Sequence, residues 1–288
     1  MIRISRTSAD AGALGLAASI LLAGLLVAAP AQAAPAGAVA VGAPAAQSPV
    51  VNYVALGDSY AAGQGAGFYD NACLQSDLSY PEMLDDVKHV KLLADASCSG
   101  ATTTDVLGQL GAIKMNKHVD LITLTVGAND LGLGAITAAC TVSFASPECQ
   151  AALAAAYALL SPPAPGVPSE LAVRLATTFT AVAAAAPDAT ILVTGYPHLF
   201  ETPPPTDPNY AVISQLNAAT DLLNATIAGV VQQLAMAGVD IHYVGVTDDF
   251  AGHSIGSPDP WIHASGPDAF HPTAAGYVAY TAAIRSEL

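Results

Sequence analysis

Five short apolar runs rich in β-branched residues alternate with segments of helical character, and this alternation constrains the fold more than any other feature. The runs cover residues 51–56, 90–93, 121–126, 190–194 and 239–246, and the helical segments cover 81–88, 103–117, 169–186, 210–237 and 272–288. Short buried strands that alternate with helices are typical of a parallel sheet with helices on both faces. The sequence therefore predicts a single α/β domain built on a central parallel sheet.

The first 34 residues have the pattern of a secretory signal peptide. Arg3 and Arg6 give a basic start, residues 13–29 are apolar, and Ala31-Gln32-Ala33 has the small-x-small form that signal peptidase cleaves. An uncleaved anchor is the alternative. Residues 35–48 are mainly Ala, Gly, Pro and Val without charge, which is typical of a flexible linker. We expect a leader at 1–34, a linker at 35–48, a folded domain at 49–288 and an extracellular location.

The acidic balance of the chain limits its partners. Eight Lys and Arg residues stand against 23 Asp and Glu residues, so the formal net charge is −15 at pH 7. Such a field repels nucleic acid and anionic membrane surfaces. No stretch after the leader is long and apolar enough to span a bilayer. We therefore expect a neutral or cationic substrate, no nucleic-acid partner, no membrane span after leader removal, and a monomer.

Four cysteines, an even number in a chain with an export signal, predict two disulfides. They allow three pairings. Cys140 and Cys149 bracket a short loop that contains Pro147, which favours their local pairing and leaves Cys73 with Cys98. A zinc site is the competing interpretation, but the chain has no Cys-x-x-Cys run.

Four polar motifs lie where chemistry is expected in such a fold, because α/β sheets carry their sites at the carboxyl edge. In chain order they are Gly57-Asp58-Ser59-Tyr60, Cys98-Ser99-Gly100-Ala101, Gly127-Ala128-Asn129-Asp130 and Asp268-Ala269-Phe270-His271. The first and third directly follow apolar runs. Pro272 suits the first position of a helix, which places His271 at a junction between loop and helix. Asp58 and Asp130 are predicted to cap turns or helices.

These residue types suit the hydrolysis of an ester. A serine hydroxyl such as that of Ser59 becomes a nucleophile when a neutral imidazole, here that of His271, accepts its proton. A carboxylate, here that of Asp268, fixes the imidazole tautomer. The backbone N–H groups of Ser59 and Gly100 and the amide of Asn129 are candidates for an oxyanion hole. Tyr196, Leu199 and Phe200 follow the fourth run and could form an apolar wall beside an acyl group.

The four motifs resemble the four blocks of the SGNH (GDSL-type) hydrolases, and most of all the secreted actinobacterial esterases and lipases in that superfamily. The resemblance covers the chain from Val51 to the last helical segment. It implies a flavodoxin-like three-layer α/β/α sandwich, no cofactor and no metal, and Ser59, Gly100, Asn129 and His271 as the four named positions. It also implies the two disulfides given above. Some secreted members orient the histidine through a backbone carbonyl, but Asp268 stands three residues before His271, so we expect a triad.

Other functions remain as alternatives. A deacetylase of polysaccharides would use the same site with a different pocket. A metal-dependent phosphoesterase needs several histidines at the strand ends, and the chain has no Gly-Asn-His-Asp or Gly-Asn-His-Glu run. A non-catalytic binding module is a third class. The acidic late loop could bind a metal, although a solvated loop is the simpler interpretation; its candidate ligands are Asp248, Asp249, His253, Asp259 and His263.

Overall fold

The computed structural model of the protein describes residues 49–288, apart from 117, 141–142 and 145. Its centre is a five-stranded sheet. The leader and linker expected at 1–34 and 35–48 lie outside the described residues. The strands are β1 (Val51–Gly57), β2 (Val90–Asp95), β3 (Leu121–Thr125), β4 (Thr190–Thr194) and β5 (Ile241–Val244). All four neighbouring pairs are parallel, and four of the five strands begin within one residue of the expected runs.

The strand order is β2-β1-β3-β4-β5, which is the flavodoxin-like order. Chain connections run in opposite directions from β1 and from β3, so the carboxyl ends of these two strands border a switch point where ligands bind in such sheets. Leu56 pairs with Leu124 and Gly57 with Thr125, which brings the ends of β1 and β3 level. The predicted fold is confirmed, and Ser59 and Asn129 both follow strands that end at this switch point.

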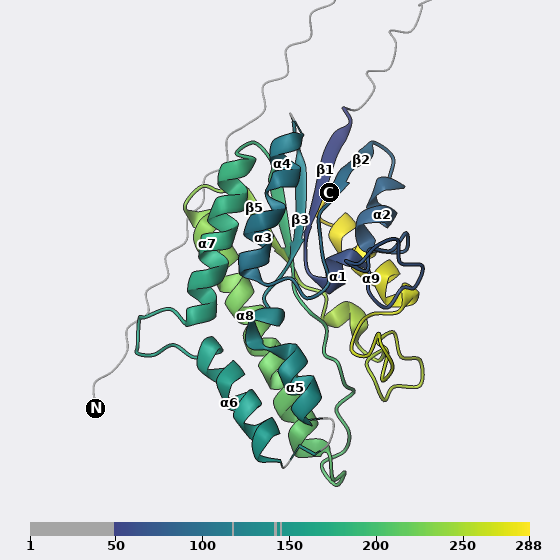
Figure 1. Cartoon of the computed structure of the whole chain (residues 1–288), viewed down its shortest axis with the longest axis vertical. Coiled ribbons are helices and arrows are strands. Elements are labelled where there is room, and N and C mark those ends of the chain that lie inside the picture. Colours follow the sequence, from purple (N-terminus) through teal and green to yellow (C-terminus); the bar gives the residue numbers. More distant parts are fainter. Residues whose placement is uncertain (1–48, 117, 141–142, 145) are drawn as a thin grey trace, which may run out of the picture. The chain divides into compact units, whose positions relative to one another are not determined.

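Helices cover both faces of the sheet (Figure 1). On one face α3, α7 and α8 pack in sequence, and on the other α2 packs against α9. The helices are α1 (Ser59–Ala62), α2 (Tyr80–Asp85), α3 (Thr103–Gln109), α4 (Gly111–Met115), α5 (Leu133–Cys140), α6 (Pro147–Leu160), α7 (Glu170–Ala185), α8 (Tyr210–Met236) and α9 (Ala274–Arg285), with short 3₁₀ turns η1 (Asn129–Leu131) and η2 (Asp248–Phe250).

Two helical segments differ from the sequence prediction. The segment expected at 103–117 is broken at Leu110 into α3 and α4, and the break lies between Gly108 and Gly111, two residues of low helix propensity. Helix α5 was not predicted, because its eight residues carry no capping signal and have little amphipathic pattern. It pairs instead with α6, to which the Cys140–Cys149 disulfide joins it.

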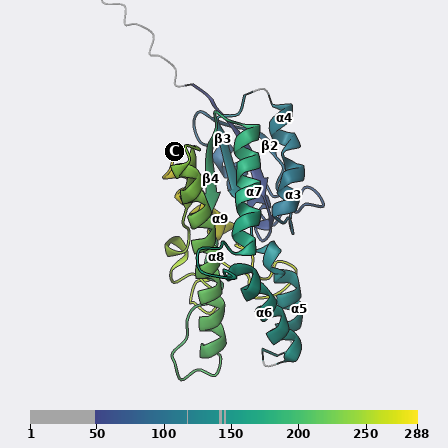
Figure 2. The same ribbon diagram turned by 90° about the vertical axis from the view of Figure 1, so that its left-hand side faces the viewer.

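A second, smaller apolar cluster lies beyond the carboxyl edge of the sheet. Cys140, Cys149 and Leu153 form its buried centre, and Ile136 and Leu216 pack against it. Figures 1 and 2 both show α5, α6 and the N-terminal half of α8 together, and Figure 1 shows this group past the end of β1, where α1 begins. This extension gives the sheet edge a helical wall. In residues 49–288, outside the four positions named above, no helix has both the length and the apolar character needed to cross a membrane.

Candidate active site

Ser59 lies in a sharp turn directly after β1. Gly57 has a φ of +132°, and a Cβ at this position would lie 2.4 Å from the carbonyl oxygen of Thr125, so only glycine fits. Asp58 caps α1 by accepting a hydrogen bond from the backbone N–H of Tyr60, which confirms its predicted capping role. Ser59 therefore occupies the first position of α1, where its side chain is held at the switch point with 6% of its surface exposed.

The imidazole of His271 meets this serine across 212 residues of sequence. Its Nε2 atom lies 2.8 Å from Oγ of Ser59, and its Nδ1 atom lies 3.0 Å from the carbonyl oxygen of Ala269. A carbonyl can only accept a hydrogen bond, so Nδ1 carries the proton and Nε2 is free to accept one from the serine. This is the tautomer that a general base needs.

The turn that carries His271 differs from the prediction at Pro272. Helix α9 begins at Ala274, and the Thr273 side chain caps it by accepting from the N–H of Gly276. Pro272 therefore precedes the cap instead of taking the first helical position, and it pairs with Ile262 in an isolated antiparallel bridge. A threonine cap satisfies the first turn directly, which explains why the helix starts two residues later.

Asp268 does not form the contact expected of a triad. Its carboxylate accepts a hydrogen bond of 2.7 Å from the hydroxyl of Tyr69. Within residues 49–288, excluding the four undescribed positions, the Nδ1 position of His271 is bonded to the Ala269 carbonyl and not to this carboxylate. The predicted role of Asp268 as the direct orienter of His271 is therefore corrected: a backbone carbonyl two residues from the histidine occupies that place.

Tyr69 joins the loop after Ser59 to the loop before His271. Besides donating to Asp268, its hydroxyl accepts a hydrogen bond from the N–H of Gly65. His263 donates from Nε2 to the carbonyl of the same Gly65. A Cβ on Gly65 would lie 2.2 Å from the carbonyl oxygen of Pro272, so the two loops touch backbone to backbone. This contact keeps nucleophile and base in register.

Burial controls the charge of His271. It lowers the pKa of the imidazole, and the Ala269 carbonyl and the negative charge of Asp268 oppose that effect only in part. The neutral form therefore dominates near pH 7, as a proton acceptor requires. The side chain of Asp268 acts on the imidazole through its charge, and its carboxylate makes no hydrogen bond to the ring.

Asp58 belongs to a buried network that the sequence did not reveal. Its carboxyl group is 1% exposed, accepts a hydrogen bond of 2.6 Å from the hydroxyl of Tyr196, and has its pKa raised to about 7, chiefly because burial penalises the charged form. The Tyr196 hydroxyl also accepts from the N–H of Ala128 at 3.3 Å. Tyr196 thus connects the serine loop to the loop that carries Asn129. Only its position after β4 signalled proximity to the site.

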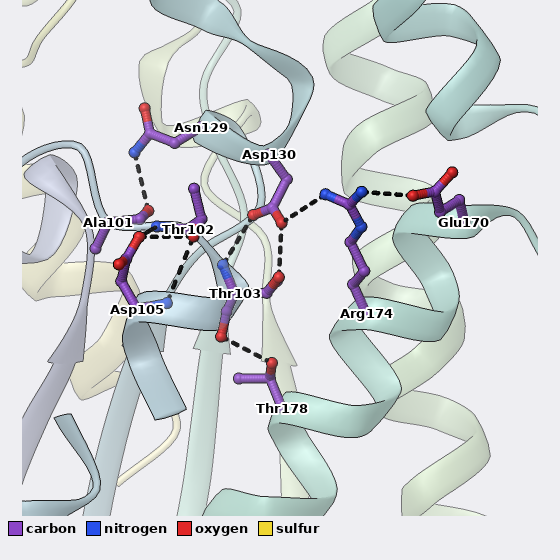
Figure 3. Close-up of polar contacts among 9 residues, drawn as sticks. All are labelled: Ala101, Thr102, Thr103, Asp105, Asn129, Asp130, Glu170, Arg174 and Thr178. Carbon is purple, nitrogen blue, oxygen red and sulfur yellow. Dashed lines mark hydrogen bonds and ion pairs between the residues drawn. The ribbon is translucent and has the colours of Figure 1, made fainter. Parts of the chain in front are cut away.

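Two further loops bring the expected oxyanion donors to the same edge. Gly100 has a φ of +83° in the turn after β2, and Asn129 opens η1 after β3. The side-chain amide of Asn129 donates one hydrogen to the carbonyl oxygen of Ala101 at 3.0 Å, which leaves its second hydrogen available (Figure 3). In the described part of the chain, the N–H groups of Ser59 and Gly100 have no protein acceptor. All three donors are therefore free for a ligand oxygen.

Asp130 fixes the relative position of these two loops, as Figure 3 shows. Its buried carboxylate accepts hydrogen bonds from the N–H and the hydroxyl of Thr103, at 2.9 and 2.6 Å. Because Thr103 is the first residue of α3, Asp130 caps a helix distant in sequence, which refines its predicted capping role. Arg174, itself paired with Glu170, approaches the same carboxylate at 3.5 Å.

Both predicted disulfides are present, and one of them borders the site. Cys73 is bonded to Cys98, and Cys140 to Cys149. The N–H of Ser99 donates to the carbonyl of Cys73, so the bridge is reinforced beside Gly100. Cys73 lies on the loop that follows Ser59, and the bridge therefore ties the serine loop to the loop that carries Gly100.

The two late-loop histidines considered as metal ligands have other partners, and Asp248 and Asp249 are exposed. The ring of His253 stacks on Trp261 and donates from Nδ1 to the carbonyl of Asp259. His263 bonds to Gly65, as described above. Among residues 49–288, with the exceptions already given, no three His, Cys, Asp or Glu side chains gather closely enough to hold a metal ion.

An apolar cavity of about 110 Å³ adjoins the candidate site. Tyr60 and Ala128, the chain neighbours of Ser59 and Asn129, belong to its lining, as do Tyr196 and Leu199. The expected apolar wall is therefore formed by two of its three predicted members. Phe200 packs its ring on that of Phe270 instead.

The fold and the site place a serine–histidine pair and three candidate hydrogen-bond donors at the carboxyl edge of a flavodoxin-like sheet, an arrangement typical of serine hydrolases. Residues 55–279 match the GDSL-like Lipase/Acylhydrolase family, and the chain belongs to that family. It is 33% identical over 233 residues to a lipase of Streptomyces rimosus, an alignment that covers 78% of this chain and 82% of the relative. Lipase 1 of Streptomyces coelicolor is 32% identical, with 78% of this chain and 81% of the relative covered.

Comparison with solved structures also finds a Streptomyces lipase and a Streptomyces phospholipase. The extracellular lipase of Streptomyces rimosus and the phospholipase A1 of Streptomyces albidoflavus NA297 each superpose with a TM-score of 0.73 at 31% identity. Each match covers 83% of this chain and all of the other chain. The protein is therefore a carboxylic ester hydrolase with the fold of the GDSL lipases and esterases.

Proposed function

We propose that this ester hydrolase acts as a secreted esterase or lipase in which Ser59 is the nucleophile and His271 the general base. The observation that carries the proposal is the 2.8 Å contact between Oγ of Ser59 and Nε2 of His271. The bond from Nδ1 to the Ala269 carbonyl supports a dyad, because it selects the required tautomer without a carboxylate in contact with the ring.

The reaction proceeds in two halves. His271 accepts the proton of Ser59 as Oγ attacks the ester carbonyl carbon, and the imidazolium then donates that proton to the departing alcohol. An acyl-serine remains. A water molecule then gives a proton to His271 as its oxygen attacks the acyl carbon. The imidazolium returns that proton to Oγ of Ser59 as the bond between Oγ and the acyl carbon breaks, which releases the carboxylic acid and restores the serine. The negative charge of Asp268 stabilises the imidazolium of both halves through space.

The tetrahedral intermediates carry a negative oxygen. The N–H groups of Ser59 and Gly100 and the remaining amide hydrogen of Asn129 bind that oxygen in this proposal. Such donors act most strongly when they are held in place before the reaction. Two hydrogen bonds support this, one that Asn129 donates to the Ala101 carbonyl and one that the Thr103 N–H donates to Asp130, since they fix the two donor loops to each other.

The proposal that the enzyme is secreted rests on the sequence of residues 1–34 and on the relatives. The Streptomyces rimosus lipase whose structure superposes on this chain is an extracellular protein. Two disulfides suit an oxidising compartment. Expression of the full chain in an actinobacterial host, followed by N-terminal sequencing of the protein in the medium, tests the expected cleavage after Ala33 or Ala34.

Ser59→Ala and His271→Ala test the catalytic assignment. We expect each variant to lose roughly a thousandfold or more of the wild-type kcat on p-nitrophenyl acetate while its melting temperature stays close to the wild-type value. Ser99→Ala is a matched control, because Ser99 lies on the neighbouring loop and donates to Gln64. Retention of wild-type turnover by the Ser59 variant would reject the proposal.

A further inference from the structure

The peptide unit that leads into His271 is held at both ends. Its oxygen, the carbonyl oxygen of Phe270, accepts a hydrogen bond of 2.7 Å from the hydroxyl of Tyr60. Its N–H, that of His271, donates to the backbone carbonyl of Asp268 at 3.1 Å. Because a peptide unit is planar, these two bonds fix the plane that carries the Cα atom of His271. The place of the imidazole therefore depends on Tyr60, the residue that follows Ser59 in the chain.

Phe270 has a backbone conformation that needs support from outside its loop. Its φ is +69°, in the left-handed region where the Cβ of a residue other than glycine crowds the backbone. Such strain persists only where surrounding contacts hold it, and it is concentrated at functional sites. The N–H of Phe270 donates to the carbonyl of His263 at 2.8 Å, which holds one side of the residue. The hydroxyl of Tyr60 holds the other side, at the carbonyl.

The side chain of Tyr60 is itself fixed. It is 4% exposed, and its ring packs edge-on against Tyr196 and Tyr280, with centroid distances of 5.2 and 6.0 Å. Closely packed rings of this kind leave little room for the side chain to swing. Burial and the charge of Asp58 raise the pKa of the Tyr60 hydroxyl, so it stays protonated and donates its hydrogen bond at any pH near neutrality.

The hydrogen bond between Tyr60 and Phe270 runs parallel to the contact between the reacting side chains. Ser59 and Tyr60 are consecutive in α1, and Phe270 and His271 are consecutive in the loop before α9. The neighbour of the serine is therefore bonded to the neighbour of the histidine, beside the 2.8 Å contact between Oγ of Ser59 and Nε2 of His271. A misplacement of reacting groups by about 1 Å costs on the order of 100-fold in rate.

We propose that Tyr60 is a positioning residue of this esterase, whose hydroxyl acts through the Phe270 carbonyl to hold His271 where Nε2 accepts the proton of Ser59. The inference rests on the proposed function of Ser59 and His271. Tyr60 transfers no proton in this role. Its hydroxyl therefore affects the rate of the chemical step and not the binding of the ester, because the ring that lines the neighbouring cavity stays in place when only the hydroxyl is lost.

Tyr60→Phe tests the proposal, since it removes one oxygen atom and keeps the ring. Tyr280→Phe is the matched control, because the buried hydroxyl of Tyr280 also donates to a backbone carbonyl, that of Gly195 at 2.9 Å. The measurements are kcat and KM on p-nitrophenyl butyrate and the melting temperature of each variant. We expect similar losses of melting temperature in the two variants.

Tyr60→Phe should lower kcat by roughly 10- to 100-fold and change KM by less than about twofold, whereas Tyr280→Phe should keep the wild-type kcat. Three results would overturn the proposal: a wild-type kcat in Tyr60→Phe, a change in that variant confined to KM, or an equal loss of kcat in the control.

The acceptor side of the hydrogen bond supplies a second test. Phe270→Ala and Phe270→Gly both remove the ring that packs on Phe200, but only glycine adopts a positive φ without strain. The hydroxyl of Tyr60 thus has less strain to oppose in the glycine variant. We expect Tyr60→Phe to cost several-fold more kcat when it is added to Phe270→Ala than when it is added to Phe270→Gly. Equal costs in the two backgrounds would contradict a role through the Phe270 backbone.

The proposed function fails separately from this inference. If Ser59→Ala or His271→Ala hydrolyses p-nitrophenyl butyrate at the wild-type rate, the catalytic assignment is wrong whatever the Tyr60 variants do. If both of these variants are inactive and Tyr60→Phe keeps the wild-type kcat, only the positioning role of Tyr60 is wrong.

Discussion

The hydroxyl of Tyr69 lies 2.7 Å from the carboxylate of Asp268, although 199 residues separate them in sequence. Asp268 stands three residues before His271 in the sequence, and this hydrogen bond directs its carboxylate to Tyr69. The Nδ1 atom of His271 donates to the Ala269 carbonyl instead. The carboxylate therefore contributes charge near the base without fixing the orientation of its ring. This division of roles leads to the first prediction.

Asp268→Asn should lower kcat by less than about tenfold, whereas loss of a triad carboxylate costs on the order of ten-thousandfold. The charge of Asp268 raises the pKa of His271, so its removal should shift the acid limb of the pH profile of kcat/KM to lower pH. Asp249→Asn, an exposed change of the same charge, is the control. A thousandfold loss of kcat in Asp268→Asn would show instead that Asp268 acts as the carboxylate of a triad.

The wild-type enzyme should lose activity only in moderately acidic solution. Burial lowers the pKa of His271 below the value of about 6.5 that free histidine has, and the protonated ring cannot accept the serine proton. We expect kcat/KM to fall below a midpoint that lies under about pH 6.5. Initial rates on p-nitrophenyl butyrate in buffers of constant ionic strength measure it. A midpoint above this value would mean that another group, such as Asp58, controls the limb.

Tyr196→Phe should destabilise the protein more at pH 8 than at pH 5. The folded pKa of Asp58 is about 7, above its ordinary value, so the cost of the buried charge grows as pH rises toward 7 and is fully present above it. Loss of the Tyr196 hydroxyl raises the pKa of Asp58 further. It also removes a hydrogen bond to the charged carboxylate, which contributes about 2 kcal/mol to the free energy of unfolding. Urea unfolding at the two pH values tests this, with Tyr157→Phe as the control.

Asn129→Ala should lower kcat by about 100- to 1000-fold with a small change in KM. The amide binds the oxyanion in the proposed mechanism, and that charge exists only in the tetrahedral intermediates and their transition states. Asn116→Ala, which loses a side-chain bond to the Ala112 carbonyl away from the site, is the control. An equal loss in both variants would indicate a structural effect.

The two disulfides should have different functional effects. A Cys73→Ser/Cys98→Ser variant is expected to lose activity on every ester, because the bridge ties the serine loop to the Gly100 loop. A Cys140→Ser/Cys149→Ser variant is expected to keep its activity on p-nitrophenyl acetate and to lose stability, because that bridge joins α5 to α6 outside the candidate site. Each bridge contributes about 2 to 4 kcal/mol of stability, measured by urea unfolding. Identical activity profiles of the two double variants would contradict this assignment.

Much of the fold and part of the site follow from local signals. The β-branched runs mark the strands, and their alternation with helices allows few arrangements other than a parallel sheet. Helix α5 and the break at Leu110 were not predicted, because α5 depends on a disulfide partner and two glycines weaken a helix that otherwise looks continuous. Helix α9 begins at Ala274 and not at Pro272, because the sequence offers two adjacent start signals and the Thr273 cap prevails over Pro272.

The sequence by itself determined the sheet, the cysteine pairs and the positions of Ser59, Gly100, Asn129 and His271, because each depends on residue type and on its place after a strand or before a helix. Only the tertiary structure decided which acceptor meets Nδ1 of His271 and where the Asp268 carboxylate lies. Both choices are made by residues distant in sequence, Tyr69 and the loop around Gly65 among them. A hydrogen bond between loops depends on geometry that no local pattern contains, and so does the apolar cavity beside the candidate site.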